Sequence, residues 1–228
     1  MAFNMDERKQ TLLRHIIEAH IKTAQPVGSS YIAEQFLTDV SGPTVRNWMQ
    51  ELEREGLITH PHTSAGRIPT EAGYRLYIQE MLPERPLSSK HQKALSEARN
   101  GKSVDGVKAV AKKGAELSGE AVVVGFSPNN VYYTGLSNIF AKPEFASHSS
   151  VVGISRIIDH LDEVMATISD TLDDDISVLL GSDNPFGDEC ASVLTIASKG
   201  MVIGMLGPMR MDYGANIAYL KHIKTLLS

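Results

Sequence analysis

The 228-residue sequence contains a single cysteine, Cys190, which excludes an internal disulfide framework and a zinc site built on paired cysteines. It has no run of about 18 apolar residues, the length that a membrane-spanning helix needs. The N-terminus becomes charged at Asp6 and lacks the apolar stretch of a signal peptide. These absences predict a soluble, cytoplasmic protein with no membrane partner.

Charge of one sign is only mildly in excess, with 22 Lys and Arg against 27 Asp and Glu, and the net charge is −5. The acidic excess lies mainly in residues 119–228, which carry 13 acidic and 6 basic side chains, whereas residues 1–86 carry 11 and 9. Because the charge is segregated, the N-terminal part can still present a basic face to a nucleic acid. The apolar content of 42% excludes a wholly disordered chain.

Helical periodicity dominates residues 1–82. An apolar stripe predicts a first helix, which Pro26–Gly28 ends, and Ser29 or Ser30 is expected to cap a second. Ser41 is expected to cap a third helix, which Gly56 closes. The inward positions predicted for the three helices are Leu12, Leu13, Ile16, Ile17 and Ile21, then Ile32, Ala33, Phe36 and Leu37, then Val45, Met49 and Leu52.

A short strand at 57–59 and a hairpin tip at Ala65–Gly66 follow the third helix. Helix, helix, tight turn, helix and strand pair are typical of a winged helix-turn-helix. We therefore predict an N-terminal winged-helix DNA-binding domain over residues 1–82.

Pro83 and Pro86 mark a boundary, and residues 83–118 are predicted to form a linker and a connecting helix, the helix at 104–117. Further along, the pattern predicts strands at 121–126, 130–136, 176–180, 191–197 and 201–206, with helices at 149–172 and 211–227. The predicted fold class is α+β, with a C-terminal GAF-like α/β sensor domain over 119–228 that has a mainly antiparallel sheet.

The outward face of the third helix carries side chains that suit base recognition, namely Thr44, Arg46, Asn47 and Gln50. Arginine can grip guanine through O6 and N7, and asparagine or glutamine can do the same to adenine through N6 and N7. The alternative is an ordinary solvated helix face.

The polar segment 60–70 is the expected wing. It can bring Arg67 and the hydroxyls of Thr63 and Ser64 to phosphates or into the minor groove, although an ordinary solvated hairpin remains an alternative. His60 and His62 have no carboxylate or cysteine at ligand spacing, so they are interpreted as wing residues near phosphates and not as a metal site.

Three segments resemble the family of heat-inducible transcription repressors called HrcA. They are Pro26–Ser30, the stretch from Pro43 to Glu53, and Pro61–Thr70 with Gly73–Arg75. Weaker agreement continues at 117–119, 132–135, 143–145 and 207–213. The resemblance implies a dimeric repressor that binds an inverted-repeat operator (CIRCE) upstream of chaperone operons, is released on heat stress and is assisted by the chaperonin GroEL.

Helix, wing and resemblance together define the predicted DNA-binding set. It comprises Ser29, Ser30, Thr44, Arg46, Asn47, Gln50, His62, Thr63, Ser64, Gly66, Arg67 and Arg75.

The sequence departs from the family in two places. Trp48 stands where an acidic residue is usual, and the chain runs from the strand at 121–126 almost directly to Val131, without the family's further sensor sequence and dimerisation segment. The C-terminal domain is therefore expected to be shortened, and another surface has to serve a homodimer. The helix at 149–172 offers a heptad seam, although the same pattern suits a helix lying on its own sheet; the basic segment 87–118 is a further candidate. The seam positions are Val151, Ile154, Ile158, Leu161, Met165, Ile168 and Leu172.

Other reactive-looking features have plainer interpretations. Acidic neighbours raise a thiol pKa, so Cys190 is expected to be structural, and Asp173–Asp175 is expected to be a solvated turn. Arg210 with Asp212 suggests either a ligand contact or an ion pair that braces the last helix. The sequence shows no catalytic, cofactor or metal site, and we expect a protein that is not an enzyme. The alternative function is a winged-helix protein whose C-terminal domain is a ligand- or protein-binding module without operator specificity.

Overall fold

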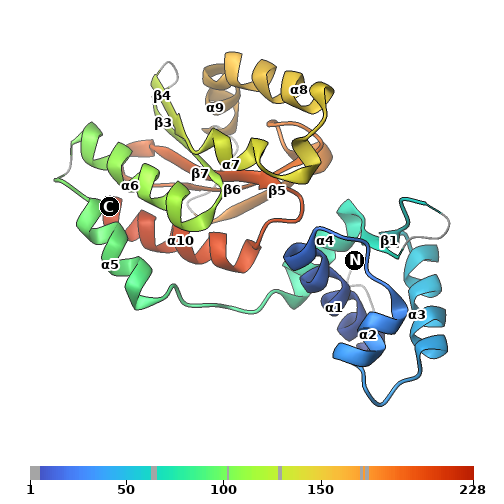
Figure 1. Ribbon diagram of the computed structural model, residues 1–228. Coiled ribbons are helices and arrows are strands. Elements are labelled where there is room, and N and C mark those ends of the chain that lie inside the picture. Colours follow the sequence, from blue (N-terminus) through green and yellow to red (C-terminus); the bar gives the residue numbers. More distant parts are fainter. Residues whose placement is uncertain (1–5, 63–65, 102, 128–129, 170–171, 173–174) are drawn as a thin grey trace. The chain divides into compact units, whose positions relative to one another are not determined.

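The computed structural model describes residues 6–62, 66–101, 103–127, 130–169, 172 and 175–228 (Figure 1). The chain divides into two compact units, Met1–Pro83 and Glu84–Ser228, and each is described by itself. Within these ranges, no helix combines the length and the apolar character required to cross a bilayer.

The first unit is built from short helices and one small hairpin. The helices are α1 (Glu7–Thr23), α2 (Ser29–Gln35), α3 (Gly42–Arg54) and α4 (Glu71–Leu76), and a π-helical turn at Tyr77–Met81 continues α4. Strands β1 (Ile58–Thr59) and β2 (Ile68–Pro69) pair antiparallel between α3 and α4. Asp6, Ser41 and Thr70 cap α1, α3 and α4 through side-chain oxygens, as the short polar residues before each apolar stripe require.

The core of this unit lies between α1 and α3. Val45, Met49 and Leu52 are buried as predicted, together with Leu12, Leu13, Ile16 and Ile17 of α1 and Ile32 of α2. Two predictions on α2 were wrong. The cap is Gly28 and not a serine, because Ser29 already belongs to the helix. Phe36 is 39% exposed, because its ring stacks on His15 at 4.6 Å between centroids and does not enter the core.

The second unit contains a five-stranded sheet in the order β4-β3-β7-β6-β5. Its strands are β3 (Ala121–Ser127), β4 (Asn130–Thr134), β5 (Ser177–Leu180), β6 (Cys190–Ile196) and β7 (Val202–Pro208). The strand pairs among the described residues are antiparallel. A mixed α/β chain with a mainly antiparallel sheet is thereby confirmed.

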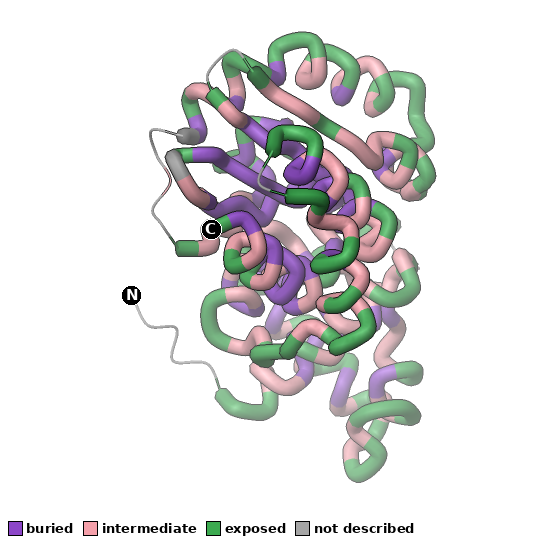
Figure 2. The backbone as a smooth tube through the Cα atoms, turned by 90° about the vertical axis from the view of Figure 1, so that its left-hand side faces the viewer, coloured by how far each residue is buried: buried purple, intermediate pink, exposed green. Residues whose placement is uncertain are grey.

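Helices cover both faces of this sheet (Figure 1). On one face α6 (Val104–Ser118) and α10 (Tyr213–Leu227) lie against the strands, and α5 (Ser89–Ala98) packs outside them. The other face carries α7 (Leu136–Phe140), α8 (His148–Asp159) and α9 (Leu161–Ser169). Single 3-10 turns occur at Pro143–Phe145, Gly181–Asp183 and Ser198–Gly200. Buried residues concentrate in the central strands and on the inward sides of the helices (Figure 2).

The long helix predicted at 149–172 is two helices, which break at His160. The break lets both pieces turn their apolar sides to the sheet. Ile154, Leu161, Met165 and Ile168 are at most 5% exposed and belong to the same core cluster as the strands. These four seam positions therefore serve the core of the unit, as the alternative interpretation of the pattern had it. The predicted turn at Asp173–Asp175 lies mostly outside the described residues.

Candidate nucleic-acid interface

Three of the predicted base-reading side chains share the exposed face of α3. Arg46, Asn47 and Gln50 are exposed, while Val45 and Met49 turn inward. Thr44 is half-buried, and its hydroxyl lies 2.9 Å from the Ser41 hydroxyl at the helix cap. The face available for recognition is therefore formed by one guanidinium and two carboxamides.

The acidic side chains in the C-terminal half of α3 are paired within the protein. Lys9 of α1 lies 2.9 Å from a Glu51 oxygen and 2.8 Å from a Glu55 oxygen. These hydrogen bonds raise the pKa of Lys9, which keeps it charged. The negative charge of α3 is thus partly neutralised before any phosphate approaches.

Glu53, the other acidic residue within α3, contacts residues at both ends of the hairpin loop. One carboxylate oxygen contacts His60 Nδ1, and the other lies 3.0 Å from Arg67 Nε and 2.9 Å from Arg67 Nη2. Burial by itself would raise the pKa of Glu53, but the hydrogen bond from His60 and the charge of Arg67 outweigh it and lower the pKa. Arg67, expected to reach toward phosphates, thus faces α3.

The backbone at the start of β2 is fixed from a second direction. Val27 and Arg67 exchange two backbone hydrogen bonds of 2.8 Å each. A Cβ on Gly66 would lie 2.6 Å from the carbonyl carbon and oxygen of Val27, so only glycine fits there. Gly66 therefore serves a close backbone approach. The predicted contacts Thr63 and Ser64 lie outside the described residues.

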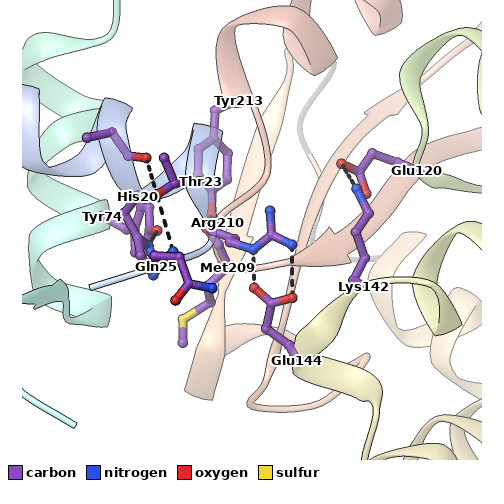
Figure 3. Close-up of polar contacts among 11 residues, drawn as sticks. His20, Thr23, Gln25, Tyr74, Glu120, Lys142, Glu144, Met209, Arg210 and Tyr213 are labelled. Atoms are coloured by element: carbon purple, nitrogen blue, oxygen red, sulfur yellow. Dashed lines mark hydrogen bonds and ion pairs between the residues drawn. The ribbon is translucent and has the colours of Figure 1, made fainter. Parts of the chain in front are cut away.

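The remaining predicted residues are spread around this centre. Ser29 is half-buried and Ser30 is exposed at the start of α2, and His62 is exposed just before the undescribed loop residues. Arg75 on α4 donates to Glu71 at 2.8 Å. In the same unit, His20 of α1 and Tyr74 of α4 are hydrogen-bonded at 2.7 Å, which joins α4 to the helical core (Figure 3).

Trp48, the departure inside the third-helix motif, is half-buried. It lines a groove of about 650 Å³ at the N-terminal ends of α1 and α3, together with Arg8, Ser41 and Thr44. Its ring is therefore placed at this groove, on the side of α3 that Thr44 shares and not on the side of Arg46 and Gln50.

The reactive-looking features of the second unit are structural. Cys190 is 2% exposed, and burial together with the charge of Glu189 raises its pKa to about 12, as expected for a structural thiol. Arg210 pairs with Glu144 (Figure 3). The carboxylate of Asp212 caps α10. In the described parts of the chain, no group of three His, Cys, Asp or Glu residues is arranged to hold a metal ion.

Sequence reasoning missed two residues that matter. Glu53 lies one turn beyond Gln50 on α3. An acidic residue on a helix face that is expected to bind DNA indicates that a basic side chain of the protein itself pairs with it. Glu120 is 4% exposed and bonds Lys142 at 3.2 Å, while its second carboxylate oxygen is buried without a partner (Figure 3). Nothing in the sequence around Glu120 predicts its burial.

The family model described as "HrcA protein C terminal domain" fits residues 70–217 of this chain. The heat-inducible transcription repressor HrcA of Synechococcus elongatus is 47% identical over 91 residues, which cover 40% of this chain and 26% of the relative. The repressor of the same name from Desulfitobacterium hafniense is 54% identical over 78 residues, 34% of this chain and 23% of the relative. That of Pelotomaculum thermopropionicum is 41% identical over 114 residues, 50% of this chain and 33% of the relative. The matched stretches thus span between 23% and 33% of these relatives.

A crystal structure at 2.2 Å resolution, described only as a hypothetical protein, resembles the whole chain. The match covers 99% of this chain and 98% of the other, with a TM-score of 0.80 and 17% sequence identity. At that identity the likeness shows a shared fold and nothing about activity.

Proposed function

The chain belongs to the HrcA family, whose model covers more than half of it, and from this premise we propose that it is a sequence-specific DNA-binding transcriptional repressor of heat-shock (chaperone) operons. Its target is an inverted-repeat operator of the CIRCE type, and heat stress releases it. A repressor of this kind acts in the cytoplasm and catalyses no reaction.

The observation that carries the proposal is the exposed face of α3. Arg46, Asn47 and Gln50 project from a helix whose opposite side is buried, and the hairpin β1–β2 is fastened to the same helix through Glu53. We infer that α1 to α3 with this hairpin form a winged helix-turn-helix, in which α3 enters the major groove. Ser29, Ser30, His62 and Arg75 then contact the sugar-phosphate backbone.

The second unit is inferred to be a shortened GAF-like domain, supported by its antiparallel sheet with helices on both faces. A two-fold symmetric operator requires two copies of α3, so we infer a homodimer. A chaperonin partner, GroEL, is proposed on the family resemblance alone.

A gel-shift titration across a salt series tests the proposal. The protein is expected to prefer a duplex with the inverted repeat over a scrambled duplex of the same composition, by about a thousandfold or more. Affinity for both duplexes should fall steeply as salt rises, because bound phosphates release their counterions. Equal affinity for the two duplexes at every salt concentration would refute operator recognition.

One observation favours a second role for the C-terminal unit. A groove of about 250 Å³ beside α8 is lined by Phe145, Ile154, Phe186 and Cys190, and also by Ser149, Ser150, Asp188 and Glu189. An apolar floor with polar and acidic groups at its edge suits a small ligand that is partly apolar and carries a hydrogen-bond donor or a positive charge. A thermal-shift screen with small neutral and cationic molecules tests this role, and the scrambled-duplex comparison separates it from the operator proposal.

A further inference from the structure

The hairpin between α3 and α4 is too short to hold its own orientation. Strands β1 and β2 contribute two residues each, and a hairpin of this size has little stability by itself. The loop that it carries, 60–67, begins at His60 and ends at Arg67. The position of that loop relative to α3 must therefore come from contacts outside the strand pair.

Besides the backbone pair of Arg67 with Val27, Glu53 supplies such contacts from α3 itself. His60 follows β1 directly and Arg67 precedes β2 directly, so the two residues continue the strand register by one pair. One carboxylate oxygen of Glu53 accepts a hydrogen bond from His60 Nδ1. The other oxygen lies 2.9 Å from Arg67 Nη2 and 3.0 Å from Arg67 Nε. A single carboxylate thus closes the base of the loop and joins it to the helix.

We propose that Glu53 is a positioning residue for operator recognition, which fixes the wing on α3 so that both elements meet the same DNA site in one geometry. The inference rests on the proposed DNA-binding function and deepens it. Glu53 touches no DNA in this scheme; it acts through His60 and Arg67.

An acid placed this close to a DNA face weakens attraction to phosphates in general. Its presence is therefore explained by geometry and not by affinity. This distinction gives the role a signature, because removing Glu53 should lower affinity for the operator while it leaves affinity for random DNA equal or higher.

The test compares Glu53→Gln with Glu51→Gln on the full chain. Both variants remove one negative charge from α3, but Glu51 pairs with Lys9 of α1, whereas Glu53 pairs with His60 and Arg67. We expect Glu53→Gln to reduce the ratio of operator to scrambled-duplex affinity about tenfold, the size of one lost charge-assisted contact. Glu51→Gln should leave that ratio unchanged.

Arg67→Ala should lower the same ratio, and the double variant Glu53→Gln with Arg67→Ala should lose little more than either single change, because both break one contact. A variant that merely unfolds would lose affinity for both duplexes equally, and a pure charge effect would raise both. A ratio for Glu53→Gln equal to that of Glu51→Gln would overturn the inference.

Hydrogen exchange of the free protein separates this inference from the proposed function. The Arg67 amide, bonded to the Val27 carbonyl at 2.8 Å, should exchange faster in Glu53→Gln than in Glu51→Gln. If the wild type showed no preference for the inverted repeat, the proposed function would fail while faster exchange would still support the fastening of the loop. Equal exchange in the two variants would overturn the fastening itself.

Discussion

Arg46 is the side chain from which most base selectivity is expected. It is exposed on the outward face of α3, and an arginine there can grip a guanine with two hydrogen bonds. Arg46→Ala should cost about 1–3 kcal/mol of binding free energy at its own base pair and relax specificity there. Titrations against operators with single base-pair changes measure this effect.

Arg54→Ala is the matched control for Arg46→Ala, because Arg54 is an exposed arginine at the other end of α3. Its loss should affect all sequences alike. If Arg46→Ala weakened operator and scrambled DNA by the same factor, Arg46 would be a phosphate contact.

Gly66 is a second single residue whose replacement has a definite expected effect. A methyl group at this position would lie 2.6 Å from the Val27 carbonyl. Gly66→Ala should lower the free energy of unfolding by roughly 1–3 kcal/mol, since the backbone pair Val27–Arg67 has to open. Gly28→Ala is the control, because the space around the Gly28 Cβ position is empty within 4 Å. Urea unfolding of both variants makes the comparison, and equal midpoints would contradict the close approach.

At the scale of elements, α8 and α9 decide between a buried core and a dimer seam. Ile154 is 5% exposed in the core cluster, whereas Val151 on the same predicted seam is 38% exposed. Ile154→Ala should lower the free energy of unfolding by about 2–4 kcal/mol, and Val151→Ala should change it by about 0.5 kcal/mol at most.

Light scattering on the same two variants completes the comparison. The oligomeric state should be that of the wild type in both. If both variants were folded but had become monomers, the helices α8 and α9 would form a dimer seam, and the assignment to the core would be wrong.

The helices and strands were largely predictable because their apolar periods are regular and their caps are local. Ser41 and the buried side of α3 are examples, as is the helix at Val104–Ser118. The break at His160 was not predictable, because the apolar pattern continues through it and no proline or glycine marks it.

The candidate site likewise has a part that the sequence predicts and a part that it does not. The exposure of Arg46, Asn47 and Gln50 follows from helical period alone. Arg67 and Glu53 are 14 positions apart and come together only in the fold. Their pairing therefore cannot be predicted from a periodic pattern in the sequence. The same holds for Glu120, whose partner Lys142 lies 22 positions away.

At the scale of the whole molecule, Glu120 should shape the dependence of stability on pH. Burial raises its pKa from 4.5 to about 7, although Lys142 acts in the opposite direction. Because the folded state holds this proton more tightly, the stabilisation is complete below pH 4.5 and is lost as the pH rises through 7.

Glu120→Gln should therefore raise the free energy of unfolding at pH 8 by roughly 1–3 kcal/mol, since it removes a negative charge that burial disfavours. The gain should disappear near pH 4.5. Glu116→Gln, at an exposed site on α6, is the control and should show no such dependence. A variant that is less stable than the wild type at pH 8 would contradict this role of Glu120.

A hydroxyl-radical footprint on the DNA upstream of the source organism's chaperone operons tests operator recognition most directly. Operator binding by two copies of α3 predicts two protected half-sites, related by a two-fold axis and about 34–36 Å or a multiple of that apart. The pattern should vanish when the inverted repeat is scrambled. Uniform protection without half-sites, or protection that survives scrambling, would contradict sequence-specific repression by this protein.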